Sequence, residues 1–241
     1  MVPGRSRVAR LFGISPLGPE SRPWYLGALG EREVARLLDQ LGADWHAIHS
    51  VPVGTSGSDI DHVLVGPGGV YTVNSKFHDG ARVWVAGRSL LVNGQRKDHL
   101  RNAAFEARRA SKLITRAAGS PVHVSAIIAI VGARSLTIRA QPAEVAVLSS
   151  VRMVRWLKQR PAVLNEEEVR HIAGTVMRSS TWGSQSAPDA DLSAFATLRD
   201  AVVAAKRRRV LWAVGVVLSP FVVMTVTFIG SVLVPMGAHL N

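Results

Sequence analysis

The chain has 241 residues, no cysteine and a formal net charge of +12 at pH 7. Without cysteine it forms no disulfide and no thiolate metal site, so any bound metal must be held by oxygen or imidazole ligands. The basic charge suits a nucleic acid or an anionic membrane surface as partner. The length allows one globular domain with a single core and a small appendage.

The first helix is predicted to begin at Ser21, with Pro23 in its first turn, and to end before Gly42. Residues 1–20 precede it and are interpreted as a loose basic N-terminal arm without the apolar run of a signal peptide. Glu31 lies at the margin of the apolar stripe of this helix, where it either reaches solvent or faces a site. The predicted buried stripe consists of Val34, Leu37, Leu38 and Leu41.

Residues 45–53 alternate as in a strand and lead into a β-hairpin over residues 58–76, with its turn at Gly66-Pro67-Gly68-Gly69. If Val65 pairs with Val70, the register sets Asp61 opposite Asn74 and Asp59 opposite Lys76. Those four polar side chains then share one face of the sheet. Buried charge is costly unless it is paired or holds a metal, so this cluster is either a strand-end ion pair between Asp59 and Lys76 or a metal site.

Residues 82–92 predict a second hairpin that extends the sheet as a meander, and residues 102–118 predict an alanine-rich helix. The polar side of this helix is basic and carries Phe105. It either follows the phosphates of a nucleic acid or is a solvated face. Its basic residues are Arg101, Arg108, Arg109, Lys112 and Arg116. The histidines lack zinc-ligand spacing, which favours structural or surface roles.

Two short apolar runs, residues 122–131 and 145–148, predict buried strands. Helices are expected over residues 151–159 and 166–177, the second capped by Asn165. The composition of residues 183–191 indicates a linker.

Residues 192–209 are interpreted as an amphipathic helix followed by a basic juxtamembrane cluster, Lys206-Arg207-Arg208-Arg209. Residues 210–234 then contain no charged side chain, and 25 residues exceed the roughly 30 Å of a bilayer core. We therefore expect one transmembrane helix. The basic cluster predicts a cell-membrane protein whose large domain is cytoplasmic, with residues 235–241 as a short extracytoplasmic tail. The alternative is a buried core helix.

Three groups of residues carry a family resemblance. Gly30-Glu31 in the first helix, the string of residues 59–70 (DIDHVLVGPGGV) and Asn74-Ser75-Lys76 resemble the nuclease-related domain, NERD, of bacterial proteins. The match is good over residues 24–118 and fainter to about residue 180. That family is placed with the restriction-endonuclease-like PD-(D/E)xK superfamily. The resemblance implies an α/β fold over residues 21–182, with a mixed sheet flanked by helices.

The resemblance also implies roles for the polar cluster. Glu31 matches the helical acid, Asp61 the metal-binding Asp, and Asn74-Ser75-Lys76 the Glu-x-Lys triplet. Many relatives have Glu where this chain has Asn74, so one negative charge is missing from a site expected to hold Mg²⁺ or Mn²⁺. Asp59 could compensate as a further ligand.

Three functions are compatible with the sequence. The first is a membrane-anchored nuclease-like domain in which Asp61, Glu31 and the Asn74 amide hold Mg²⁺ or Mn²⁺ and Lys76 orients water or neutralises the transition state. The second is a catalytically decayed module that binds nucleic acid or protein as a membrane-tethered adaptor, an alternative that Asn74 favours. A structural membrane protein without a ligand is a third, which the polar cluster argues against.

Overall fold

A computed structural model describes residues 6–53, 58–183 and 192–233. Within these ranges it does not describe the side chains of Ser58 and of residues 192–194, 222–223 and 226–233. The chain divides into two compact units. One is Pro23–Pro188, and the other combines Met1–Arg22 with Asp189–Asn241. Each unit is described by itself.

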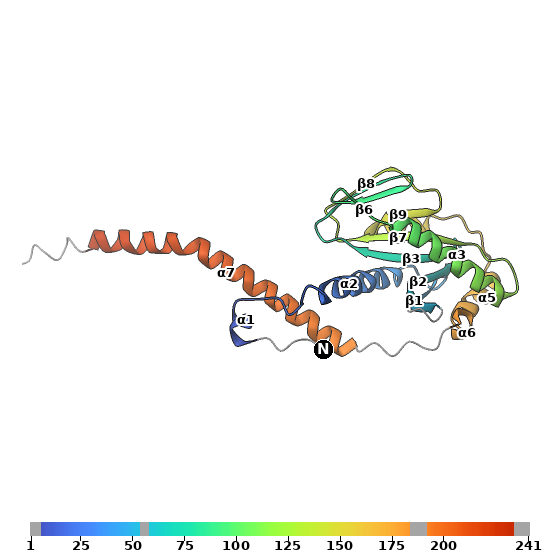
Figure 1. Cartoon of the computed structure of the whole chain (residues 1–241), viewed down its shortest axis with the longest axis horizontal. Coiled ribbons are helices and arrows are strands. Elements are labelled where there is room, and N and C mark those ends of the chain that lie inside the picture. The colour runs from blue at the N-terminus through green and yellow to red at the C-terminus, as the bar shows by residue number, and fades with distance from the viewer. Residues whose placement is uncertain (1–5, 54–57, 184–191, 234–241) are drawn as a thin grey trace, which may run out of the picture. The chain divides into compact units, whose positions relative to one another are not determined.

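The first unit is built on a five-stranded mixed sheet with the strand order β1-β2-β3-β7-β9 (Figure 1). The first three strands are antiparallel, and β3, β7 and β9 are parallel. This confirms the expected α/β mixed sheet. The almost wholly apolar strand β7 lies between β3 and β9, as expected for a strand buried on both faces. The strands are β1 (His46–Val53), β2 (Ser58–Gly66), β3 (Gly69–Phe77), β7 (Val124–Val131) and β9 (Val145–Ser149).

The β2–β3 hairpin has the predicted register at its turn, with Val65 opposite Val70. The sequence predicts that the pairing continues to Asp61 opposite Asn74 and to Asp59 opposite Lys76. This part of the prediction is wrong, because the paired region ends at His62 opposite Val73. The backbone pairing of the two strands stops at this point, next to an irregularity in β1. The pairing of β1 with β2 skips Ser50, which has a positive φ of 51° and would otherwise stand opposite Asp61.

A second sheet has the order β6-β5-β4-β8. The hairpin expected over residues 82–92 is confirmed, with Ala86 opposite Ser89, but it does not continue the main sheet as predicted. The free edge of β3 is occupied by β7, so the chain leaves the sheet after Phe77 and β4 pairs in parallel with β8. The strands are β4 (Arg82–Ala86), β5 (Ser89–Val92), β6 (Gln95–Arg96) and β8 (Ser135–Ala140).

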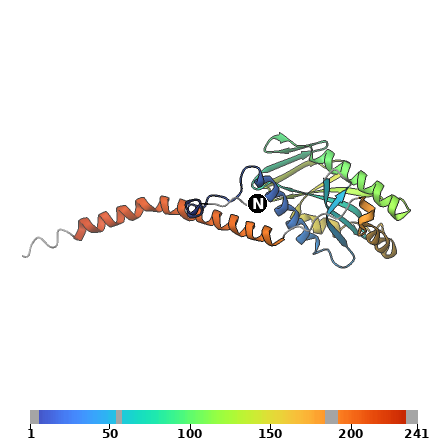
Figure 2. The ribbon, with the colours of Figure 1, turned by 60° about the horizontal axis from the view of Figure 1, so that its bottom comes forward.

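Helices cover both faces of the main sheet, and Figure 2 shows α2 (blue) and α3 (green) on opposite sides of it. Helices α2 (Ser21–Leu38) and α4 (Ser150–Lys158) pack with Leu64, Tyr71 and Val73 on one face. The opposite face packs against α3 (His99–Ala118), α5 (Glu166–Val176) and α6 (Ser179–Trp182). The inner side chains of β4 and β5 complete this second core.

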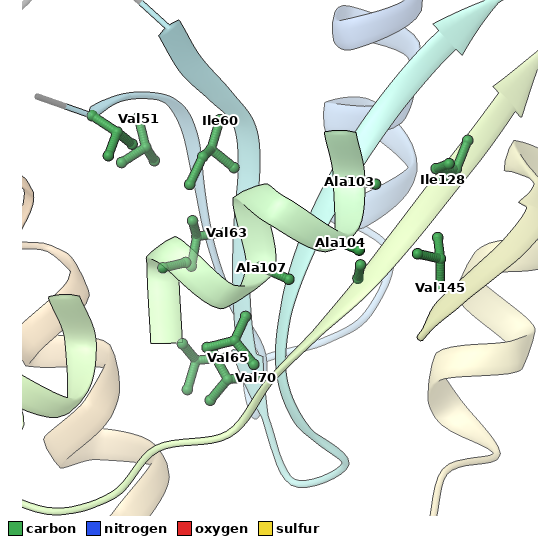
Figure 3. Packing of buried hydrophobic residues seen from close by; sticks show 14 of the residues in the cluster. Val51, Ile60, Val63, Val65, Val70, Ala103, Ala104, Ala107, Ile128 and Val145 are labelled. Atoms are coloured by element: carbon green, nitrogen blue, oxygen red, sulfur yellow. The ribbon is translucent and has the colours of Figure 1, made fainter. Parts of the chain in front are cut away.

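Helix α3 approaches the sheet through small side chains. Ala103, Ala104 and Ala107 are buried against the valines of β2 and β3 on one side and Ile128 and Val145 on the other, as Figure 3 shows. Because alanine has only a methyl group, the helix backbone comes close to the strands. Polar side chains at the margin of the same helix face can therefore reach the sheet.

The second unit contains α1 (Arg7–Leu11) and α7 (Leu192–Leu233). The predicted amphipathic helix and the uncharged segment belong to one continuous helix, which runs through Pro220. Proline removes the hydrogen bond to the carbonyl four residues earlier. That carbonyl, on Val216, accepts a hydrogen bond from Ser219 Oγ at 3.0 Å.

The N-terminal arm is not loose where the structure describes it. Trp212 Nε1 donates to the Leu11 carbonyl at 2.9 Å, and Arg208 donates to the Arg10 carbonyl at 2.9 Å. Gly13, with a φ of 68°, packs so closely on α7 that a Cβ atom there would collide with the Ala205 carbonyl oxygen. The arm is therefore bound along the start of the uncharged segment.

Within the described part of the chain, we find no helix that is both long enough and apolar enough to span a membrane. The expected span, residues 210–234, extends beyond the side chains that the structure describes. The expected linker, apart from Gly183, and the tail of residues 235–241 lie outside the described residues.

Gly30 allows α2 to approach the end of β3. A Cβ atom at this position would lie 3.2 Å from Phe77 Cβ, closer than ordinary van der Waals contact. Glu31 follows directly and is thereby brought to the end of β3 beside Lys76. Gly27, one turn earlier in α2, has open space where its Cβ would be.

We expect Gly30→Val to lower the free energy of unfolding by about 1–3 kcal/mol, the usual cost of overpacking. Gly27→Val is the matched control and should be neutral or slightly stabilising, because valine has a higher helix propensity than glycine. Urea unfolding followed by circular dichroism measures both. Equal effects of the two substitutions would contradict the close approach of α2 and β3.

Candidate metal and nucleic-acid site

The site lies where β2 and β3 separate. The Asp61 carboxylate bridges the two strands there: its Oδ2 accepts hydrogen bonds from the Ser75 backbone N–H at 2.7 Å and from Ser75 Oγ at 2.9 Å. A side chain thus satisfies the backbone amide that the neighbouring strand no longer pairs. Both bonds end on Oδ2, so they hold the carboxylate in place and leave Oδ1 for another partner.

Glu31 enters the site from α2 and is half-buried. Burial is the main reason that the pKa of Glu31 is raised, with further upward contributions from the charges of Asp61 and Asp59, while Lys76 lowers it. Helix α2 therefore brings an acid close to the strand residues that the sequence predicts as its partners.

Asn74 is 6% exposed and donates a hydrogen bond from Nδ2 to Glu106 Oε2 at 2.6 Å. Its other polar atom, Oδ1, is buried and has no hydrogen-bond partner among the described residues. Burial raises the pKa of Glu106, the Asn74 hydrogen bond lowers it, and Asp61 and Lys76 also act on it. Glu106 thus completes a polar cluster with Asn74, Asp61 and Lys76.

Glu106 is the residue that the sequence analysis missed. On a helical projection it falls between Ala117 and Leu113, at the margin of the apolar sector of α3. An acid in that sector is the signal that could have identified it.

Asp59 is exposed and pairs through its backbone with Pro52 of β1. Among the residues that the structure describes, there is no ion pair between Asp59 and Lys76, so the simple strand-end pair is not formed. The placement of Asp59 as a metal ligand stays a prediction.

Two histidines lie next to Lys76. The rings of His78 and His99 stack with centroids 5.5 Å apart, and the Nε2 atoms of both are buried without a hydrogen-bond partner in the described part of the chain. Burial and the charge of Lys76 lower the pKa of both, that of His99 to about 4. Both rings are therefore neutral near pH 7, and a neutral ring leaves the Lys76 charge available to a bound phosphate.

A cleft of about 440 Å³ opens beside the site, between α3 and the ends of β1 and β2. Asp59 and Glu106 line it together with Arg101, Arg108 and Arg109. Phe105, which is 59% exposed, lies on the same wall. The cleft thus combines site acids, guanidinium groups and an aromatic ring.

A second cleft of about 510 Å³ lies on the other side of the start of α3 and shares Arg101 and Arg108 with the first. It is the larger of the two clefts, but no acid of the site lines it, whereas Asp59 and Glu106 line the first cleft. The cationic side chains that line the second cleft are Arg88, Arg96, Lys97, Arg101 and Arg108.

The basic residues of α3 make weak partnerships. Arg101 pairs with Asp98 at 3.1 Å and Arg108 with Glu144 at 2.8 Å, all largely exposed, and such surface pairs contribute about 0–1 kcal/mol. Arg109 donates to the Val53 carbonyl at 3.1 Å. Lys112 and Arg116 are exposed but lie further along α3, away from the first cleft. The structure therefore brings only part of the predicted basic set to the site.

Within the described residues, no cluster of three or more His, Asp or Glu side chains is arranged to hold a metal ion. Two carboxylates and one amide oxygen, those of Asp61, Glu106 and Asn74, lie in the same region of the described residues. Oxygen ligands of this kind suit Mg²⁺ or Mn²⁺. The buried Asn74 Oδ1 without a partner fits such a cation.

These features define an α/β domain with acids, an amide and a lysine at a basic cleft. Residues 26–131 match the family model of the nuclease-related domain, NERD, which confirms the resemblance over this part of the chain. No curated protein matches the chain.

One solved structure is similar, the small subunit (R.BspD6I2) of the heterodimeric restriction endonuclease R.BspD6I. The identity is 9%, the alignment covers 74% of this chain and 88% of that chain, and the TM-score is 0.25. A similarity this low supports no conclusion about the fold.

We expect neutralisation of four basic α3 residues to glutamine to weaken nucleic-acid binding and to flatten its salt dependence, by about 0.9 in slope for each lost phosphate contact with duplex DNA. The four residues are Arg108, Arg109, Lys112 and Arg116. Fluorescence anisotropy at several salt concentrations measures the slope.

The matched control removes four exposed charges from α4 and α5, at Arg152, Arg155, Lys158 and Arg170. This control should leave the slope nearly unchanged. The same slope for the α3 variant and the unchanged chain would identify the basic face of α3 as a solvated surface.

Proposed function

We propose that the unit Pro23–Pro188 binds nucleic acid and hydrolyses its phosphodiester bonds with the help of Mg²⁺ or Mn²⁺. The observation that carries this proposal is the convergence of Asp61, Glu31 and Asn74 beside a cleft lined by arginines. The match of residues 26–131 to a nuclease-related domain supports it.

Each side chain has a distinct role in this proposal. The arginines of the cleft hold the phosphate backbone, and the exposed Phe105 ring offers a surface for stacking a base. Asp61, held by Ser75, with Glu31 and Asn74 Oδ1, would hold the metal ion. The bound ion supplies charge stabilisation at the scissile phosphate and acidifies a water molecule. The Lys76 ammonium neutralises negative charge that develops on the phosphate or orients the attacking water.

This proposal includes a restriction-endonuclease-like fold and a catalytic role for the site. The second candidate is a domain that has lost catalysis and binds nucleic acid or a protein as an adaptor. The neutral side chain at Asn74 favours it, because a hard cation prefers anionic oxygen ligands. Both candidates include a basic binding surface, and cleavage distinguishes them.

For an active nuclease, we expect Asp61→Asn to reduce Mn²⁺-dependent cleavage by about 10²–10³-fold, the scale for loss of one charge-stabilising group. Cleavage of labelled single-stranded and duplex DNA and RNA by the purified chain measures this. Asp39→Asn, an exposed acid after the end of α2, is the matched control and should cleave normally.

Cleavage that survives Asp61→Asn would show that the activity is not located at this site. A purified chain that binds nucleic acid but cleaves none of these substrates would favour the adaptor.

We further propose that residues 210–234 anchor the protein in the cell membrane by a single span, with the large unit in the cytoplasm. The uncharged composition of this segment supports the proposal, as does the cluster Lys206-Arg207-Arg208-Arg209 immediately before it. Trp212 lies at the start of the segment, which would be at the membrane interface, and tryptophan is enriched at such interfaces.

A reporter that is active only outside the cytoplasm should be active when fused after Asn241 and inactive when fused after Ala205. The first fusion places the reporter beyond the proposed span, and the second places it before the span. Protease protection of the same fusions in membrane vesicles provides an independent measurement. Inactivity of both fusions would exclude a single span with this orientation.

A further inference from the structure

Position 74 holds a neutral amide where the resemblance to the nuclease-related domain implies an acid. Asn74 lies on β3 next to Ser75, which holds the Asp61 carboxylate, and it is 6% exposed. Its amide can offer a neutral oxygen to a cation but no charge. An acid from elsewhere in the fold would have to supply the charge.

Helix α3 brings such an acid into direct contact with Asn74. Glu106 Oε2 accepts from Asn74 Nδ2 at 2.6 Å, a short distance typical of a hydrogen bond to a charged group. An ionised carboxylate can only accept, so the amide nitrogen must face Glu106 and the amide oxygen must point the other way.

The amide oxygen that results is unusual. Asn74 Oδ1 is buried and finds no hydrogen-bond partner among the described residues, whereas almost all buried polar atoms in proteins have one. Asp61 and Lys76 are close enough to act on the charge of Glu106, so the same small region contains both carboxylates and the orphan oxygen. A cation bound there would satisfy Oδ1 and the two carboxylates together.

We propose that Glu106 takes the place of the missing strand acid: it orients the Asn74 amide so that Oδ1 faces the bound cation, and its carboxylate supplies the negative charge. This inference rests on the proposed function, because it concerns the metal ion of that site. Glu106 is a positioning residue, since it acts on the cation in part through Asn74.

The surroundings of Glu106 argue against a purely structural role. Its neighbours on the sheet-facing side of α3 are alanines, and its hydrogen-bond partner is a neutral amide. A half-buried carboxylate in such a place is costly unless positive charge compensates it. Lys76 provides part of that compensation, and a divalent cation would provide the rest.

Titration calorimetry with Mn²⁺ on the complete 241-residue chain tests this inference without measuring activity. Glu106→Gln keeps an oxygen that accepts from Asn74 but removes the charge, and it should weaken Mn²⁺ binding by about 10–100-fold. The double variant Asn74→Glu with Glu106→Gln moves the acid from α3 to β3 and should bind Mn²⁺ within a few-fold of the unchanged chain.

The matched control is Glu144→Gln. This substitution removes an exposed acid that pairs with Arg108 of α3, the helix that carries Glu106, and it should leave Mn²⁺ affinity nearly unchanged. Circular dichroism and melting temperature verify that each variant folds. These measurements separate the loss of site charge from a general change in electrostatics.

The outcomes distinguish this inference from the proposed function. If Asp61→Asn abolishes Mn²⁺ binding while Glu106→Gln does not weaken it, the metal site stands and the role of Glu106 is wrong. If Glu106→Gln weakens binding but the double variant does not regain it, Glu106 is not a replacement for the strand acid. If the unchanged chain does not bind Mn²⁺, both the metal site and this inference are overturned.

Discussion

The separation of β2 from β3 is the structural feature on which the candidate site depends. Once the ladder ends at His62 and Val73, the Ser75 amide needs another acceptor, and the Asp61 carboxylate provides it. A continuous hairpin would have used that amide for backbone pairing and turned Asp61 toward the sheet face. The separated strands instead hold the Asp61 carboxylate between them. Glu31 of α2 and Glu106 of α3, helices on opposite faces of the sheet, approach it there.

Helix α3 combines three tasks that depend on its side-chain pattern. Its alanines allow close packing on the sheet, its arginines line the cleft, and Glu106 reaches Asn74 from the margin of the packed face. These tasks require the helix to lie near the strands, because a bulkier apolar face would hold Glu106 away from β3. The core packing and the chemistry of the site are therefore linked through the small size of these side chains.

The other face of the sheet contributes through an equally close contact. Gly30 packs on Phe77, and this brings Glu31 to the end of β3. The neutral pair of His78 and His99 stands beside Lys76 and adds no positive charge near pH 7. Lys76 lies near the acids Glu31 and Glu106 and lowers the pKa of both.

The sequence by itself predicted the hairpin and its register at the turn, because glycine turns and the alternation of side chains are local properties of the chain. The roles of Glu31, Asp61, Asn74 and Lys76 in a site are what the resemblance to the nuclease-related domain implies, and they stay a prediction. The sequence also predicted the basic side of α3. Only the tertiary structure showed that the ladder ends early, that the second hairpin joins a separate sheet and that Glu106 meets Asn74. These features depend on contacts between residues far apart in the chain, 32 positions for Asn74 and Glu106, and such contacts leave no local pattern in a single sequence.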